Sequence, residues 1–130
     1  MCKLMTTKYI LQILLILSIF VVSCGQPNPN PIDTNNVDSI VIYYNHPDDT
    51  IALPPRQLSV TSIKTFVDDW NKTCSDDICK YYPYYLITVY QKDKTNRDFR
   101  VNGQNIKERT DECFKLNDPD YFDKLWEANK

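Results

Sequence analysis

The side chains of this 130-residue chain that could do chemistry are five cysteines, one histidine and several adjacent acidic pairs. A nucleophilic cysteine needs a nearby base, and His46 is the one histidine in the sequence. A zinc site made from Cys74, Cys79 and Cys113 lacks a fourth ligand close in sequence. Adjacent carboxylates point apart along a helix or strand, so they do not form the spaced acid pair of a glycosidase. We therefore predict that the chain is not an enzyme and holds neither a metal ion nor a cofactor.

Cys24 stands between an apolar run and a segment rich in proline and asparagine. The run extends over residues 9–22 and follows a short head that carries Lys3 and Lys8. It is shorter than the roughly 20 apolar residues that a membrane-spanning helix needs. A basic head, an apolar stretch and a small residue before a break are the three parts of an export signal. We predict that residues 1–23 are a cleaved signal rather than an anchor helix.

The residues at the break, Val21, Val22, Ser23 and Cys24, resemble the lipobox of bacterial lipoproteins. That motif has an aliphatic residue three positions before an obligatory cysteine and a small residue just before it. The resemblance implies that the Cys24 sulfur carries diacylglycerol, that the signal is cut before it, and that the new N-terminus is acylated with a fatty acid such as palmitate. Two or three acyl chains hold a protein durably on a membrane, at about 0.8 kcal/mol per buried methylene. The expected location is the exported side of the outer or plasma membrane, in the cell envelope.

Three segments follow from this interpretation: the signal at 1–23, a lipidated cysteine with an extended tether at 24–36, and one folded domain at 37–130. Three prolines within 27–31 favour an extended chain, which at about 3.1 Å per residue would hold the domain up to roughly 40 Å from the bilayer. Without the two lysines of the signal, 13 basic and 17 acidic residues remain, a net charge of −4. A mildly acidic domain argues against nucleic acid as a partner.

The residue pattern of the domain predicts a small α+β fold, an antiparallel sheet with two amphipathic helices on one face. One helix is expected from an N-cap at Thr61 to Lys72, because Ile63, Phe66, Val67 and Trp70 fall at the spacing of one helical stripe. A second is expected after Asp118, with Pro119 at its first position. The dipeptide Asn102-Gly103 is typical of a tight hairpin turn. Strands are expected at 38–44, 51–53, 84–92, 97–101, up to Ile106, and 113–116.

The exported compartment is oxidising, so the cysteines that remain after lipidation of Cys24 are expected to pair. Cys74, Cys79 and Cys113 permit one disulfide and leave one thiol over. The short loop from Cys74 to Cys79 favours a local closure, with Cys113 buried at the start of its strand. A bridge from Cys113 to either of the others would restrain more of the chain and stays open.

Tyrosines gather on the strand expected at 84–92. Its two faces carry, respectively, Tyr85, Ile87 and Val89, and Tyr84, Leu86, Thr88 and Tyr90. A two-layer domain this small covers one sheet face with helices, so the other should display Tyr84 and Tyr90, together with Tyr43. The alternative is that these rings lie over the edges of the core. Tyrosine offers a flat apolar ring and a hydroxyl, which suits protein interfaces and sugar stacking.

Two functions are compatible with these features. The first is a non-enzymatic envelope lipoprotein that binds an envelope protein or a glycan through the tyrosine-bearing sheet face. The alternative is an inhibitor or immunity protein that guards the cell against an exported hydrolase or toxin, for which small size, acidity and a membrane anchor are suitable properties.

Overall fold

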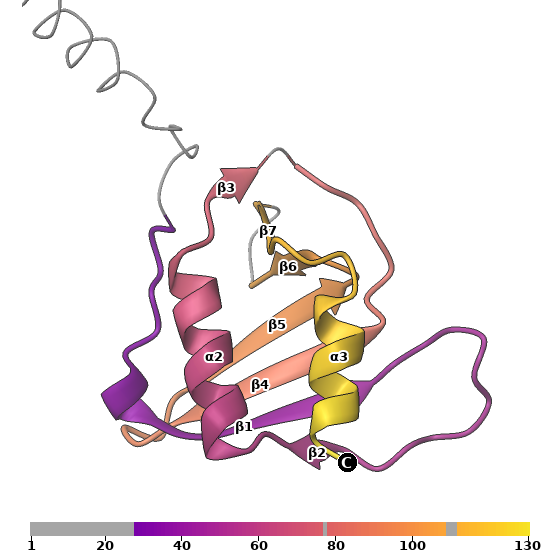
Figure 1. The fold of residues 1–130 in the computed structure, drawn as a ribbon, viewed down its shortest axis with the longest axis horizontal. Helices are drawn as coiled ribbons and strands as arrows, with labels where there is room; N and C mark the ends of the chain where they lie inside the picture. The colour runs from indigo at the N-terminus through magenta and orange to yellow at the C-terminus, as the bar shows by residue number, and fades with distance from the viewer. Residues whose placement is uncertain (1–27, 77, 109–111) are drawn as a thin grey trace, which may run out of the picture.

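The computed structural model describes residues 28–76, 78–108 and 112–130; the expected signal and Cys24 lie outside this part of the chain. Within it, one antiparallel sheet of seven strands is covered on one face by two α-helices (Figure 1). This confirms the predicted α+β class. The elements are η1 (Thr34–Asn36), β1 (Val37–Tyr44), β2 (Arg56–Gln57), α2 (Val60–Asn71), β3 (Ser75–Asp76), β4 (Tyr85–Gln91), β5 (Asn96–Asn102), β6 (Asn105–Lys107), β7 (Cys113–Lys115) and α3 (Tyr121–Ala128).

The strands lie in the order β2-β1-β4-β5-β6-β7-β3, and every neighbouring pair is antiparallel. Strands β4 to β7 form a meander, whereas β1 adds to β4 from the other side. The strands that flank α2 in sequence, β2 and β3, are the two edges of the sheet. Helix α2 therefore carries the chain across the whole width of the sheet.

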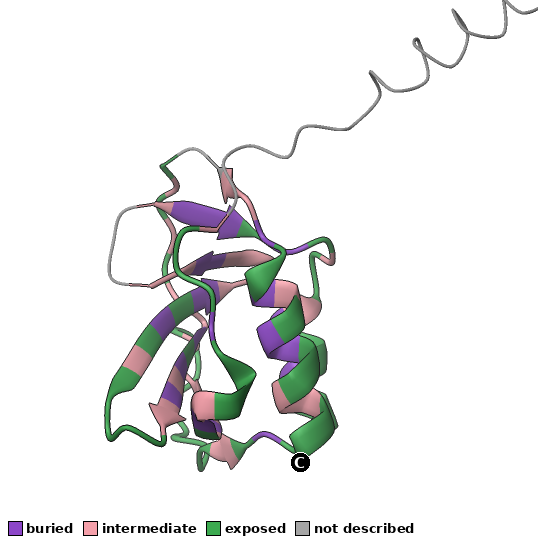
Figure 2. Ribbon diagram, turned by 90° about the vertical axis from the view of Figure 1, so that its left-hand side faces the viewer, coloured by how far each residue is buried: buried purple, intermediate pink, exposed green. Residues whose placement is uncertain are grey.

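The core lies between the helices and the inner face of the sheet, where Figure 2 shows the buried residues. Alternate residues of the central strands point inward, as the period of a strand requires. Phe66, Val67 and Trp70 of α2 are buried, which confirms the predicted stripe at these positions. The core residues of the helices and central strands are Ile40, Ile42, Phe66, Val67, Trp70, Tyr85, Ile87, Val89, Phe99, Val101, Phe122, Leu125 and Trp126.

Two predicted helix starts were wrong by a few residues. The N-cap of α2 is Ser59, whose Oγ accepts from the amide of Ser62 at 3.1 Å. Helix α3 starts at Tyr121 with Asp120 as its N-cap. Asp118 lies in the preceding turn, where its Oδ1 accepts from the Asp120 amide at 3.0 Å and its Oδ2 accepts from the Lys124 ammonium at 2.6 Å. The first turn of α3 therefore starts later than the proline signal indicated.

The strand expected at 51–53 is also absent, and the edge strand β2 forms at Arg56–Gln57 instead. Pro54 and Pro55 have no amide to donate, so Arg56 is the first residue after them that can join the ladder with β1. The hairpin between β5 and β6 turns at residues 103–104, one position later than predicted. Gly103 takes a positive φ of 60° at the first central position, which suits a glycine.

The largest correction concerns residues 28–36, which the sequence predicted to be a free tether. These residues, here called the strap, pack against the domain. The Ile32 side chain is 2% exposed and belongs to the core. The side-chain amide of Asn71 makes two hydrogen bonds to the Ile32 backbone. It accepts from Ile32 N at 2.7 Å and donates to Ile32 O at 2.8 Å. The domain therefore begins by Asn28 and not at Val37.

The carbonyl groups of the strap explain why a proline-rich segment docks. Proline favours an extended chain whose carbonyls cannot bond within the segment. The Asn30 carbonyl accepts from Trp70 Nε1 at 2.9 Å and from Arg97 at 2.8 Å, and the Pro31 carbonyl accepts from Arg97 at 3.0 Å. Tertiary partners supply the donors that the strap itself lacks.

We predict that Asn71→Ala lowers the free energy of unfolding by about 1–3 kcal/mol, because it removes both hydrogen bonds to Ile32 and leaves half-buried backbone groups unpaired. Urea unfolding measures this effect, and limited proteolysis should show new cleavage within 28–36. The matched control is Asn96→Ala on the exposed start of β5, which should change stability by less than about 0.5 kcal/mol. Equal effects of the two substitutions would mean that the strap does not contribute to the fold.

Candidate functional site

The sheet face opposite the helices, here called the open face, presents a regular grid of side chains on β1, β4 and β5. The strand register places them in three rows, which are Ser39–Tyr90–Asn96, Val41–Thr88–Asp98 and Tyr43–Leu86–Arg100. Each is exposed or half-buried. The intervening residues of the same strands fill the core, except Arg97, which bonds to the strap. The open face is therefore a mixed surface of aromatic, aliphatic and charged groups.

Tyr43 and Tyr90 stand in the outer rows of this grid, yet their hydroxyl oxygens meet at 3.4 Å. The two outer rows are four residues apart, or about 13 Å along the strands. Two tyrosine side chains bridge that distance only when both extend along the sheet toward each other, over the middle row. Their rings thus lie end to end on the surface. We call the pair the two-tyrosine platform.

Polar groups adjoin the platform. The Thr88 hydroxyl donates to the Asp98 carboxylate at 2.8 Å in the middle row. The pKa of Tyr43 is raised above its ordinary value, chiefly by the hydrogen bond with Tyr90, then by burial and the Asp98 charge. The sequence indicated the two tyrosines but not Asp98 and Arg100, because the partner and register of β5 depend on the hairpin turn at residues 92–95.

Tyr84, the third predicted member of this surface, lies elsewhere. It packs against the core, and its ring centroid is 4.2 Å from that of His46. His46 in turn stacks on Tyr44 at 6.0 Å, and its Nδ1 accepts from the Asp48 amide at 3.3 Å. For Tyr84 the alternative interpretation, a ring over the edge of the core, is therefore the one observed.

The same aromatic group supports the loop over residues 45–55, which projects from the β1–β2 edge (Figure 1). At its base the Tyr44 hydroxyl donates to Asp49, and this bond is the main cause that raises the pKa of Tyr44 to about 12. Beyond the base, Ile51 is 72% exposed and Leu53 is 40% exposed. The loop thus presents apolar side chains to solvent from a supported base.

Among the described residues, a disulfide joins Cys79 to Cys113, which are separated by 34 positions in the sequence, and the expected Cys74–Cys79 pair does not form. The expected local closure was wrong because residues 75–76 pair with β7, which brings Cys79 beside Cys113 instead. Lys107, on the open side of β6, donates to the Cys79 carbonyl and lies over the Tyr81 ring.

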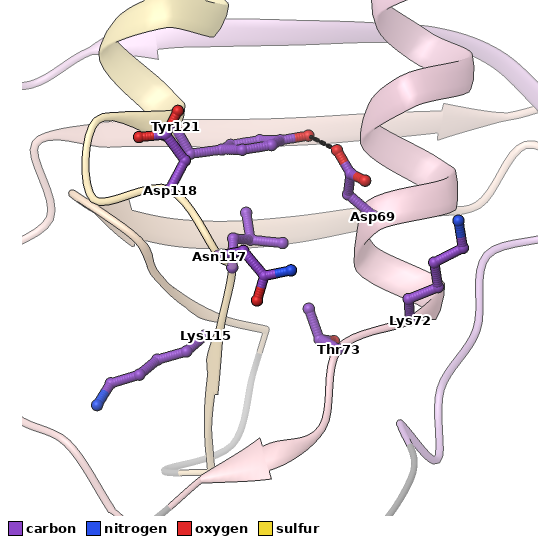
Figure 3. A pocket seen from close by; sticks show the side chains of 8 residues that line it. Asp69, Lys72, Thr73, Lys115, Asn117, Asp118 and Tyr121 are labelled. Carbon is purple, nitrogen blue, oxygen red and sulfur yellow. Dashed lines mark hydrogen bonds between the residues drawn. The ribbon is translucent and has the colours of Figure 1, made fainter. Parts of the chain in front are cut away.

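A cleft of about 320 Å³ lies between the end of α2 and the start of α3 (Figure 3). Its central contact is the Tyr121 hydroxyl, which donates to Asp69 at 2.8 Å, while Asp118 pairs with Lys124. The pKa of Tyr121 is raised well above its ordinary value, mainly by burial and then by the bond to Asp69. The carboxylates of Asp69 and Asp118 thus both have partners within the domain, and we interpret the cleft as part of the contact between the two helices.

Within the part of the chain that the structure describes, no group of three or more metal-ligating side chains comes together. No helix among the same residues is long and apolar enough to cross a membrane. No protein-family model matches the chain, and no curated protein or solved structure is significantly similar to it.

We predict that the domain loses stability as the pH rises above about 10, the ordinary tyrosine pKa. Tyr85 is buried and Tyr121 is half-buried, and their phenols donate to Asp123 and Asp69. Burial raises both pKa values. A folded-state pKa above the unfolded value means that folding favours the protonated phenol. The resulting contribution to the free energy of unfolding is complete below the unfolded pKa and is lost as the pH rises through the folded pKa.

Urea unfolding at several pH values between 8 and about 11 tests this. The double variant Tyr85→Phe/Tyr121→Phe should show a weaker alkaline loss than the unsubstituted chain. An identical slope in both proteins would assign the alkaline sensitivity to other groups.

Proposed function

We propose that this protein is a lipid-anchored lipoprotein of the cell envelope and a non-enzymatic binding module. The anchor is argued from the sequence alone, from the resemblance of residues 21–24 to a lipobox. Binding is argued from one structural observation, the end-to-end placement of Tyr43 and Tyr90 on the sheet face that the helices leave uncovered. The partner is a glycan or a protein of the envelope.

Between these two partners, the composition of the open face favours a linear glycan. Sugar rings stack their apolar faces on flat aromatic rings and bond through their hydroxyls to neighbouring polar groups. The platform is about 13 Å long. The middle row supplies the Asp98 carboxylate, and the row of Tyr43 supplies the exposed Arg100. A stable protein interface has a larger apolar centre, whereas here the aliphatic neighbours of the two rings are Val41 and Leu86.

The inhibitor or immunity role is the second candidate, and a different observation favours it. The 45–55 loop projects from the sheet edge and exposes Ile51 and Leu53 on a base supported by Tyr44 and His46. An apolar loop on a rigid scaffold suits insertion into a groove of another protein.

We predict that protein extracted from the membrane of a lipoprotein-producing bacterial host has the mass of residues 24–130 plus diacylglycerol and an acyl chain. Cys24→Ser should abolish both the added mass and release of the signal. Cys2→Ser, a cysteine within the signal, is the matched control and should leave lipidation unchanged. A thioether and a disulfide both use the single sulfur of Cys24, so recovery of a Cys24–Cys74 disulfide peptide would contradict the anchor.

We predict that Tyr43→Ala and Tyr90→Ala each weaken binding of the purified protein to cell-wall glycan by at least about fivefold, because one aromatic contact contributes about 1–3 kcal/mol. Tyr43→Phe and Tyr90→Phe keep the ring and should retain most of the binding. Co-sedimentation with isolated cell-wall glycan measures this, and Lys64→Ala on the exposed side of α2 is the control.

The same variants separate the two candidate functions when photo-cross-linking to envelope proteins is measured in parallel. If Ile51→Asp removes a specific protein adduct while the tyrosine variants keep it, the inhibitor or immunity role replaces the glycan-binding one. If binding to glycan is unchanged in both alanine variants, the platform is not the binding site.

A further inference from the structure

We propose that the strap determines how the domain stands on the membrane. The β3 edge of the sheet, with the end of α2, faces the bilayer at close range, and the β1–β4 region with the two-tyrosine platform stands away from it. This inference rests on the lipidation of Cys24 under the proposed function. It replaces the expectation of a domain held loosely at up to roughly 40 Å.

The first step is the length of chain between the lipid and the domain. Asn28 is already bonded to the domain: its amide donates to the Thr73 carbonyl at 3.2 Å, and its side chain donates to the Trp70 carbonyl at 2.9 Å. Cys24 is four residues earlier, which spans at most about 14 Å. The lipid is therefore attached within that distance of Asn28, which is bonded to Thr73 in the segment between α2 and β3.

The strap is firmly attached to the domain. The strap is held from the helix layer by Trp70 and Asn71, and from the sheet by Arg97 on β5. Arg97 is itself fixed by a two-point ion pair with Glu108, with Nε–Oε1 at 2.7 Å and a second bond at 2.8 Å. Both side chains are less than one-fifth exposed, at 16% and 18%, so the pair is shielded from solvent. An attachment point held this way keeps its position relative to the sheet.

The third step is the order of the strands. In Figure 1 the strap runs beside α2 from the β3 end of the domain toward the start of β1. The sheet order β2-β1-β4-β5-β6-β7-β3 places β4 and β1 four and five neighbour spacings from β3. At about 4.8 Å per spacing, the platform lies roughly 20–24 Å from the anchored edge. The 45–55 loop joins β1 to β2 and lies at the same far edge.

One edge of the domain therefore faces the membrane, and the opposite region faces away from it. The edge that carries the anchor also carries the Cys79–Cys113 disulfide on β7, next to β3. The surface that meets a partner stands beyond the lipid headgroups, so an envelope glycan can reach it without displacing lipid. The strap thus converts a lipid anchor into a defined orientation.

Energy transfer to the membrane surface tests this orientation. A fluorescent amino acid is encoded at Lys72, exposed at the end of α2, or at Gln57, exposed on β2. The lipidated full chain is extracted and reconstituted into phosphatidylcholine vesicles that carry an acceptor dye on a small fraction of their headgroups. We expect transfer from position 72 to exceed transfer from position 57 several-fold. Equal transfer from both positions overturns the inference.

Two further variants test whether the strap causes this orientation. Asn71→Ala/Arg97→Ala should lower the transfer from position 72 toward that of position 57, whereas Asn96→Ala/Arg100→Ala, the same residue types on the open face, should not. Should the first variant fail to fold, a six-residue Gly-Ser insertion between Pro27 and Asn28 lengthens the connection without touching the strap. Unchanged transfer after that insertion contradicts the inference.

The failure of the anchor is distinguishable from the failure of the orientation. A chain whose intact mass lacks diacylglycerol and that does not float with the vesicles overturns the proposed anchor, and the orientation with it. A lipidated chain that floats but gives equal transfer overturns the orientation alone.

Discussion

The burial of Trp70 is the interaction on which the rest of this domain depends. Its ring is 1% exposed and packs edge-on against Phe99 of β5 and Phe114 of β7, at centroid distances of 5.0 and 4.9 Å. A buried indole needs an acceptor for its N–H, and the Asn30 carbonyl of the strap provides it. One side chain of α2 thus joins the helix layer, the sheet and the strap.

This arrangement connects the proposed anchor to the proposed binding surface. Because α2 crosses from one edge strand to the other, the strap beside it also spans the sheet, from the β3 edge to β1. The covered face of the sheet provides stability, and the Cys79–Cys113 disulfide joins residues near the β3 edge, where we propose that the anchor lies. The β1–β4 region of the open face keeps the two-tyrosine platform and is the surface that we propose binds a glycan.

Particular residues show how far the sequence could be interpreted. The stripe of Phe66, Val67 and Trp70 predicted α2, and the alternation around Ile87 and Val89 predicted a strand with one buried face. Tyr43 and Tyr90 were expected on the open face from the same alternation, and they are there. Tyr84 was expected beside them but packs against His46, because it precedes the first paired residue of β4 and the alternation does not extend to it.

The sequence by itself determined the class of the fold, the location of the helices and most strands, and the existence of an uncovered sheet face, because these follow from the spacing of neighbouring residues. The tertiary structure alone decided three things: which cysteines pair, that the proline-rich segment is a strap, and that two tyrosines four residues apart in register touch. Each depends on contacts between segments distant in sequence. Carbonyls that proline leaves unpaired indicate that a partner is needed, but only the folded chain brings Trp70, Asn71 and Arg97 to them.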